Sequence, residues 1–331
     1  MPKDSKAVSA WRSIVARYQE SNPRRALWQV ANTYVPFAGL WYLMYLSLEV
    51  SYWLTLGLAV VAAGFLARIF IVFHDCGHGS FFGSRRWNDV LGYVSGILTF
   101  TPYHYWRHSH SIHHATAGNL DRRGVGDIWT MTVREYAQAS LWLRLRYRFY
   151  RSPVVLFLLG PVYVFIVEQR VASFKAGWRW QQSVQWTNLG ILVMAVGVSA
   201  LIGVKAYLLI QLPIISVAAI VGVWLFYVQH QFDGVYWERR PSWDYFTTAM
   251  KGSSFYKLPR ILQWFSGNIG FHHTHHLSPR IPNYLLEKCH RENPIFHQVT
   301  VLRLRESLKT IRYRLWDEER QQLVGMGAAW L

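Results

Sequence analysis

Long apolar stretches alternate with polar, basic segments along the chain, and their lengths predict membrane-spanning helices. Residues 31–50 carry a single charge, Glu49, at their far end. At 1.5 Å per residue, a helix of about 20 residues crosses the roughly 30 Å hydrocarbon layer of a bilayer. Residues 52–73 form a second such stretch after a very short turn. The two stretches therefore predict a helical hairpin.

A second hairpin is expected in the second half of the chain. Residues 184–204 and 206–229 are uncharged and are separated only by Lys205. Two other apolar segments suit a span less well. Residues 88–103 are short and interrupted by glycines and a proline, which favours an interfacial position, and residues 153–167 fall below the usual spanning length.

Shorter amphipathic patterns flank these spans. Residues 141–151 alternate apolar residues with arginines, which suits either a basic helix on anionic lipid headgroups or an ordinary solvated run of charges. In the C-terminal region, four apolar residues recur at helical spacing and predict an amphipathic helix: Leu304, Leu308, Ile311 and Leu315.

The composition agrees with a membrane protein. Of the 331 residues, 52% are hydrophobic and 16% are charged, a balance that is unusual for a soluble protein. The 17 Trp and 19 Tyr are residues that collect at membrane–water interfaces. The formal net charge of +17 would also suit nucleic acid. Basic residues that flank apolar spans more often follow the positive-inside rule, so we expect no nucleic-acid partner.

Two cysteines, Cys76 and Cys289, are too few for a disulfide framework or for a cysteine-ligated iron–sulfur cluster within this chain. Any redox partner is therefore expected to be a separate protein. The polar opening of the chain does not match a cleavable signal peptide, so the first span is expected to remain in the mature protein.

Histidine is concentrated in three clusters whose spacing places the rings on shared helix faces. His74 and His78 are four residues apart, and the second and third clusters each offer an i, i+3, i+4 set. Neutral imidazole is a good ligand for iron, zinc, copper or nickel. A lone histidine in a helix is usually structural, but three face-matched clusters predict a metal site. Its candidate ligands are His74, His78, His110, His113, His114, His272, His275 and His276.

Eight imidazoles exceed what one ion accepts, so the pattern implies two ions. His230 ends the fourth apolar stretch and is a candidate for a ninth ligand, with an ordinary interfacial histidine as the alternative. Asn268 lies four residues before His272 and is a candidate to orient a ligand or to hold a water molecule. The single Glu-x-x-His sequence, Glu287–His290, is too little for a carboxylate di-iron site, and no His-Glu-x-x-His zinc motif occurs.

Membrane topology constrains these segments further. If the three clusters form one site, an even number of crossings must separate any two of them. Residues 88–103 therefore cannot cross, and residues 153–167 are the segment to reject between the second and third clusters. All of the 35 Lys and Arg except Lys205 and Arg68 then lie on the histidine side, which the positive-inside rule assigns to the cytoplasm.

The predicted fold is an all-α integral membrane protein with four transmembrane helices in two hairpins, interfacial helices, and a cytoplasmic cap that carries the histidine clusters. We expect a single domain over residues 1–331. Its parts are a cytoplasmic arm (1–30), the first hairpin (31–73), the first two clusters with interfacial helices (74–183), the second hairpin (184–229), and the third cluster with the C-terminal cytoplasmic region (230–331).

The clusters HDCGH, HSIHH and HHTHH, with the flanking sequences TPYHYWRHSHSIHHATAGNL and GNIGFHHTHHLSPRIPNY, resemble those of the membrane fatty acid desaturases. The likeness covers about residues 70–290 and is closest to bacterial members and to the plant-type Δ12 and ω-3 acyl-lipid desaturases. It implies an enzyme with two non-haem iron ions, which uses O₂ and two electrons to form a C=C bond in a fatty acyl chain held as a lipid or a thioester. The electrons would come from an external donor of the ferredoxin or cytochrome b5 type.

The resemblance also assigns the ligands, because the eight cluster histidines and His230 match the metal-binding positions of the family. His104 and His108 fall where relatives have aromatic residues, and His273 falls at a variable position, so none of the three is expected to bind metal. Phe226 stands where the stearoyl-CoA branch has an asparagine four residues before the extra histidine. A water-mediated ligand of that kind is therefore not expected at this position.

Two other functions fit part of the pattern. A related membrane di-iron hydroxylase, acting on an alkane, sterol or carotenoid, would use a similar site, but its clusters are spaced differently and its product retains oxygen. A metal transporter or sensor would need ionisable residues within the membrane, which the last two spans lack. The expected setting is the inner membrane of a bacterium, with the active site facing the cytoplasm. The sequence sets neither the double-bond position nor the acyl carrier.

Overall fold

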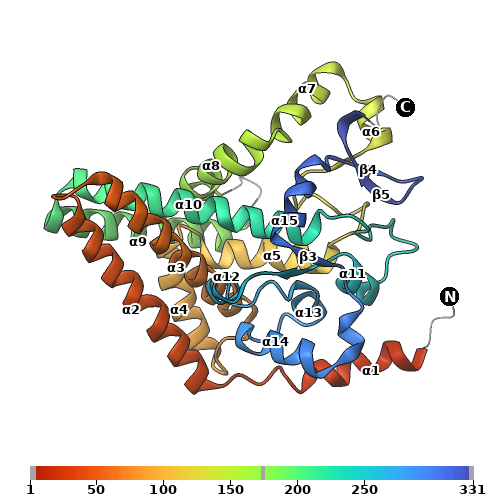
Figure 1. Ribbon diagram of the computed structural model, residues 1–331, viewed down its shortest axis with the longest axis horizontal. Coiled ribbons are helices and arrows are strands. Elements are labelled where there is room, and N and C mark those ends of the chain that lie inside the picture. The colour runs from red at the N-terminus through yellow and green to blue at the C-terminus, as the bar shows by residue number, and fades with distance from the viewer. Residues whose placement is uncertain (1–4, 173–175, 328–331) are drawn as a thin grey trace.

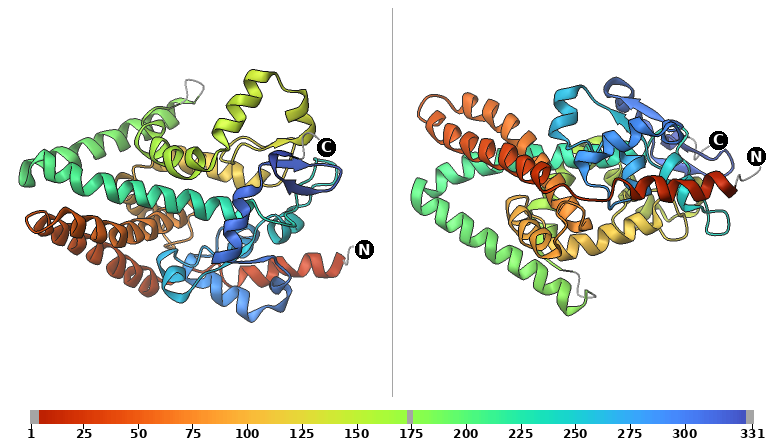
Figure 2. Two further views of the ribbon diagram at one scale, coloured as in Figure 1. Left: turned by 45° about the horizontal axis from the view of Figure 1, so that its top comes forward. Right: turned by 90° about the horizontal axis from the view of Figure 1, so that it is seen from below.

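The computed structural model describes residues 5–172 and 176–327 and is built mainly from helices. Its longest helices are α2 (Pro23–Ser47), α3 (Tyr52–His78), α9 (Trp178–Ile202) and α10 (Val204–His230). Helices α2 and α3 lie side by side, and α3 also packs against α10 (Figure 1). Helices α9 and α10 meet at Gly203, whose φ of +85° allows a sharp turn, and they diverge from there (Figure 2).

The ends of these helices follow from the local sequence. Asn22 caps α2 by accepting a hydrogen bond from the backbone N–H of Arg25 at 3.0 Å. Pro23 follows at the start of the helix, where an N–H has no partner within the helix. Helix α3 ends at Gly79, which has a left-handed φ of +69° and donates its N–H back into the last turn. The first histidine cluster therefore occupies the last turns of α3.

Three helices in the described part of the chain are long and apolar enough to cross a membrane, namely α3, α9 and α10. The other predicted span, residues 31–50, lies mostly in α2, which has 25 residues but is not among the three. A further candidate arises only if Leu141–Tyr150 and Val155–Arg170, which are bent by 56°, count as one span. Within its most apolar window α9 is only 6% buried, so nearly all of it is available to lipid.

Shorter helices follow one another along the chain between α3 and α9. They are α4 (Arg85–Leu98), α5 (Tyr103–Thr116), α6 (Val133–Gln138), α7 (Leu141–Tyr150), the π-helical turn η1 (Val155–Leu159), α8 (Gly160–Ile166) and the 3-10 turn η2 (Glu168–Arg170). The segment that sequence analysis judged too short to span is thus folded as short pieces. Helix α7 exposes a row of large apolar side chains, as its amphipathic pattern predicts: Leu141, Trp142, Leu145 and Phe149.

Short helices also make up most of the terminal regions. They are α1 (Ser5–Ala16) at the start of the described chain, and then α11 (Tyr245–Lys251), α12 (Arg260–Phe265), α13 (His272–Leu277), α14 (Asn283–Glu292), η3 (Pro294–His297), α15 (Leu304–Ser307) and η4 (Leu308–Arg312). Helix α13 holds the third histidine cluster and lies fully buried against α11 and α14.

Short strands accompany these helices, and the all-α prediction missed them. One sheet has the order β1 (Met131–Thr132), β4 (Leu315–Asp317) and β5 (Gln322–Val324), with β1 parallel and β5 antiparallel to β4. The second sheet pairs β2 (Phe255–Lys257) with β3 (Val301–Arg303) in parallel.

The amphipathic helix predicted through Leu304, Leu308, Ile311 and Leu315 is wrong as a continuous element. The chain forms α15 and η4 and then enters strand β4. Pairing of β4 with β1 and β5 buries Leu315 and Trp316 completely. This tertiary burial outweighs the helical spacing of the apolar residues, because local periodicity is only a weak guide where long-range packing is available.

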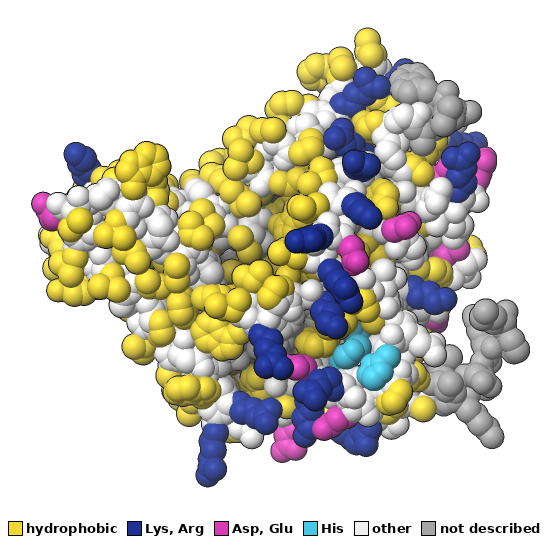
Figure 3. All heavy atoms as spheres, in the orientation of Figure 1, with side chains coloured by type: hydrophobic (Ala, Val, Ile, Leu, Met, Phe, Trp, Pro, Cys, Tyr) yellow, Lys and Arg dark blue, Asp and Glu magenta, His cyan; other side chains and the backbone are white. Residues whose placement is uncertain are grey.

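The surface divides into an apolar part and a basic part. Hydrophobic side chains dominate the end of the molecule formed by α2, α9 and α10, whereas Lys and Arg side chains form a band across the middle of the face drawn in Figure 3. Such a border between apolar and basic surface is what a protein half embedded in a bilayer requires. Helices α5 and α13, which carry six of the candidate ligands, lie away from the apolar end of the molecule (Figure 1).

Candidate metal centre

Four helices bring the predicted histidines together in the interior. His74 and His78 come from the last turns of α3, and His230 is the last residue of α10. Helix α5 contributes one group of rings and the short helix α13 contributes another: His110, His113 and His114, and His272, His275 and His276. All nine candidate ligands named from the sequence therefore meet in one region, although the segments are up to about 200 residues apart in the chain.

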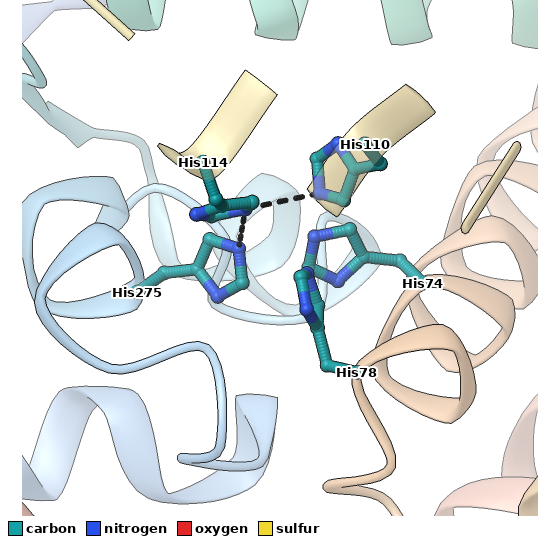
Figure 4. A group of neighbouring side chains, drawn as sticks. All are labelled: His74, His78, His110, His114 and His275. Carbon is teal, nitrogen blue, oxygen red and sulfur yellow. Dashed lines mark hydrogen bonds between the residues drawn. The ribbon is translucent and has the colours of Figure 1, made fainter. Parts of the chain in front are cut away.

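Five of these rings form a first set: His74, His78, His110, His114 and His275. One nitrogen of each ring lies within 4.8 Å of one nitrogen of every other ring. Figure 4 shows the five rings converging on a common centre, two from α3, two from α5 and one from α13. The Nε2 atom of His114 is 3.1 Å from that of His110 and 3.0 Å from that of His275.

The other four rings form a second set beside the first: His113, His230, His272 and His276. Nitrogens of His113, His230 and His276 lie within 4.8 Å of one another. His272 belongs with them, because its Nε2 atom is 2.9 Å from that of His230 and 3.1 Å from that of His276. The neighbours His113 and His114 on α5 thus contribute to different sets.

The arrangement of nitrogens suits a cation better than hydrogen bonds alone. An imidazole Nε2 has one position in the ring plane, which holds either a proton or a lone pair. The Nε2 of His230 is nevertheless approached by both His113, at 3.2 Å, and His272, at 2.9 Å. In the first set, the Nε2 of His78 is buried without a hydrogen-bond partner. A positive ion within each set would satisfy the lone pairs of that set, so the residues fit a metal.

The electrostatics also favour neutral rings that are ready to bind a metal. Burial, and after it the neighbouring imidazoles, lowers the pKa of His114, His272 and His276 well below the ordinary value for histidine. These rings therefore stay unprotonated near neutral pH, and a neutral imidazole is the form that binds a metal ion.

Two carboxylates hold the far sides of two rings. Asp75 lies 3.0 Å from Nδ1 of His74, and Asp127 lies 2.6 Å from Nδ1 of His113. The backbone carbonyl of Gly252 lies 3.2 Å from Nδ1 of His230. None of the three supports was predicted from the sequence. Asp75 offered a signal, because it directly follows a histidine of the first cluster, whereas nothing in the spacing of Asp127 pointed to His113.

The histidines that were not expected to bind metal lie outside both sets. His108 is exposed and stacks on Trp180 with ring centroids 4.4 Å apart, and His104 packs edge-on against Tyr93. His273 turns away from its cluster, and its Nε2 lies 3.0 Å from Nδ1 of His290. The i, i+3, i+4 spacing of His272, His275 and His276 leaves His273 outside the set in the same way.

Asn268 occupies a more distant place than the sequence suggested. It has a positive φ of 60°, and its side-chain amide donates to the carbonyl of Asn283 at 3.4 Å. Asn283 in turn contacts Asp75. Among the described hydrogen bonds, the side chain of Asn268 is therefore connected to the histidines only through these two residues.

An apolar cleft leads to the second set. It is lined by the rings of His113 and His230, mainly by apolar side chains such as Trp129, Phe226 and Trp237, and also by polar ones that include Arg123 and Asp127. The Phe226 ring centroid lies 5.1 Å from that of His113 and 5.2 Å from that of His230. The cleft is therefore a hydrophobic approach to one side of the histidine centre.

Comparison with known proteins connects these residues to an enzyme family. A family model described as fatty acid desaturase matches residues 51–301. A fatty acid desaturase of Bacillus subtilis is 50% identical over 314 residues, which cover 95% of this chain and 89% of that protein. An sn-1 oleoyl-lipid 12-desaturase of Synechocystis is 26% identical, over 88% of this chain and 78% of that protein. An sn-1 acyl-lipid omega-3 desaturase (ferredoxin) from the same organism is 26% identical, over 67% and 62%.

Proposed function

The chain belongs to the fatty acid desaturase family, and from this premise we propose that it uses O₂ to introduce a C=C bond into a fatty acyl lipid. In the balanced reaction, two neighbouring methylene groups of the chain each lose one hydrogen. O₂, two electrons from a donor and two protons are consumed, and two molecules of water are released. The observation that carries the proposal is the pair of adjoining buried imidazole sets, the second of which lines an apolar cleft.

We assign one iron ion to each set. The first would be held by His74, His78, His110, His114 and His275, and the second by His113, His230, His272 and His276. Nitrogen ligands suit iron as well as zinc, copper and nickel, but zinc has no redox chemistry and does not serve an oxidation. When bound, the two iron ions would activate O₂ and supply the oxidising power for removing the hydrogens.

The cleft is proposed to position the acyl chain. Its walls of Trp129, Phe226 and Trp237 present aromatic surface to methylene groups, and they reach the rings of His113 and His230. Apolar walls also displace water from the reacting carbons, which limits side reactions at an oxidising centre. The positions of the walls relative to the two ions would then select which pair of methylenes reacts.

Four membrane spans, α2, α3, α9 and α10, are proposed for the chain. The second and third histidine clusters flank the bent segment at 141–170 as well as α9 and α10. Rings of the two clusters lie close together, since the Nε2 atoms of His114 and His275 are 3.0 Å apart. An even number of membrane crossings must therefore separate the two clusters in the chain. Helices α9 and α10 supply two crossings, so the bent segment would not add a third. The basic band then faces the cytoplasm, which in a bacterium makes the inner membrane the setting.

The electron donor is proposed to be a separate protein of the ferredoxin or cytochrome b5 type. The two cysteines of the chain cannot hold an iron–sulfur cluster, and one of the similar cyanobacterial proteins is named as using ferredoxin. The Lys and Arg band across the molecule would attract an acidic donor. Membrane lipids supply both the setting and the substrate.

Fatty acid profiling in a host that lacks endogenous desaturation tests this function. Wild-type protein, expressed with a ferredoxin and its reductase, is expected to produce unsaturated chains with one defined double-bond position. His113→Ala should abolish the product, whereas His108→Ala, on the same helix but outside both sets, should retain it. An unchanged profile despite a supplied donor would contradict the proposal, and an oxygenated product would indicate the related hydroxylase.

A further inference from the structure

Each histidine set has one ring that is hydrogen-bonded to a carboxylate, and the two carboxylates are held differently. Asp75 contacts His74 of the first set, and Asp127 contacts His113 of the second. In metal sites such a carboxylate fixes the proton on Nδ1, points the Nε2 lone pair at the metal, and makes the imidazole a stronger electron donor.

Asp75 is part of the rigid interior. Its side chain is 1% exposed. One carboxylate oxygen accepts from His74, and the other accepts two hydrogen bonds from Asn283, from the backbone N–H at 2.6 Å and from the side-chain amide at 2.9 Å. Asp75 therefore joins the end of α3 to the start of α14. Removing it would disturb the packing of two helices as well as one ring.

Asp127, by contrast, does not join two helices through its described hydrogen bonds. It belongs to the loop between α5 and β1, and its side chain is 19% exposed. Among the described residues, its second oxygen accepts only a long hydrogen bond of 3.3 Å from the backbone N–H of Gly124. The principal contact of Asp127 is thus the 2.6 Å hydrogen bond to His113. This carboxylate also lines the apolar cleft that reaches the second set.

The loop is shaped to bring Asp127 to this position. The preceding residue, Gly126, has a φ of +72°, and a Cβ atom there would lie 3.2 Å from the carbonyl oxygen of Ser109 and 3.3 Å from Cβ of His113. A side chain would both strain the backbone and push the loop away from α5. Glycine at this place therefore permits the close approach on which the carboxylate–imidazole contact depends.

We propose that Asp127 is the positioning residue of the second histidine set, holding His113 in the metal-binding tautomer and adding negative charge behind it. The inference rests on the proposed function and deepens it, because it assigns an electronic role at the ion nearest the cleft. Negative charge behind a ligand favours the more oxidised metal ion. Loss of this charge should therefore move the reduction potential of the second ion in the positive direction.

The variant Asp127→Asn tests the proposal, since asparagine has nearly the same shape and can still accept from Nδ1. In purified, iron-loaded protein we expect both irons to remain, one of two Mössbauer signals to change, and the midpoint potential to become more positive. Turnover with saturating donor should fall about 10- to 100-fold, the usual effect of losing such a ligand support. Asp127→Glu keeps the charge and should lie closer to wild type than the asparagine variant does.

Asp121→Asn is the matched control. Asp121 lies on the same loop and is paired with Arg239, but it contacts no ring among the described hydrogen bonds. Its variant should keep the wild-type potential and Mössbauer signals. Wild-type potential and signals in Asp127→Asn would overturn the inference, even if turnover fell, and so would a glutamate variant no nearer to wild type. These outcomes leave the proposed function standing, whereas wild-type protein that binds no iron would overturn both.

Discussion

Two histidines in the same cluster, His273 and His275, should differ in how the same substitution affects iron binding. The His275 variant should lose iron, and the His273 variant should keep it. Both rings are fully buried on the six-residue helix α13. The Nε2 of His275 lies 3.0 Å from that of His114 in the first set, whereas the Nε2 of His273 lies 3.0 Å from Nδ1 of His290. Glutamine is similar in size to histidine and can form hydrogen bonds, but it lacks the imidazole ring. Comparing the two variants therefore distinguishes the loss of a metal ligand from the loss of a buried side chain.

The magnitudes follow from what each ring contacts. His273→Gln removes the ring whose Nε2 can make one hydrogen bond, with His290 or with Thr274. Loss of that bond and the unpaired buried partner that remains should lower the free energy of unfolding by about 1–2 kcal/mol. His275→Gln removes one of five converging nitrogens. Loss of an outer support costs about 10- to 100-fold in metal affinity, and loss of a direct ligand should cost at least about 100-fold.

Two assays check this. Plasma mass spectrometry on purified protein measures iron per chain, and gas chromatography measures the unsaturated product. His273→Gln should keep two irons and turnover within about threefold of wild type, because a loss of 1–2 kcal/mol leaves the native state dominant. His275→Gln should lose iron and product. Iron loss in the first variant, or full iron and normal turnover in the second, would refute the assignment of rings to sets.

Two further substitutions test the packing that supports the centre. Arg151→Met should lower the free energy of unfolding by about 3 kcal/mol or more, because the buried guanidinium donates to Thr130, Gln231 and the carbonyl of Tyr313, and methionine removes these three hydrogen bonds from a charged donor. Thermal unfolding in detergent should show this loss, with exposed Arg134→Met unchanged. Gly92→Ala should cost about 1–3 kcal/mol, since its Cβ would lie 2.2 Å from the Tyr103 ring, whereas Gly39→Ala meets no atom within 4 Å. Equal unfolding of the two alanine variants would contradict this account.

The nine histidines named from the sequence come together in the structure, because helical spacing places i, i+3 and i+4 rings on one face. The sequence could not divide the rings into sets. His113 and His114 are neighbours, yet one faces His230 at the end of α10 and the other faces His275 on α13. That division depends on how distant helices approach α5, which periodicity does not record.

Asp127 and the C-terminal strands show the same limit. The carboxylate reaches His113 only because Gly126 lets the loop close on α5, a contact that leaves no repeating pattern in the sequence. The spacing of Leu315 predicted that it would continue a helix. In the structure it lies in strand β4, which pairs with β1 and β5, and its side chain is buried there. By contrast, the long apolar stretches appeared as long helices, and the resemblance to the desaturase family was confirmed, since both depend on patterns that are local in the chain.

The central claim is that two iron ions held by nine histidines carry out the desaturation. Its most direct test is the iron content of purified wild-type protein that converts a saturated acyl chain to an unsaturated one with a supplied electron donor. The account predicts two irons per chain, with turnover proportional to iron content across partly loaded samples. Full turnover with one iron or none per chain, or with another metal in its place, would contradict it.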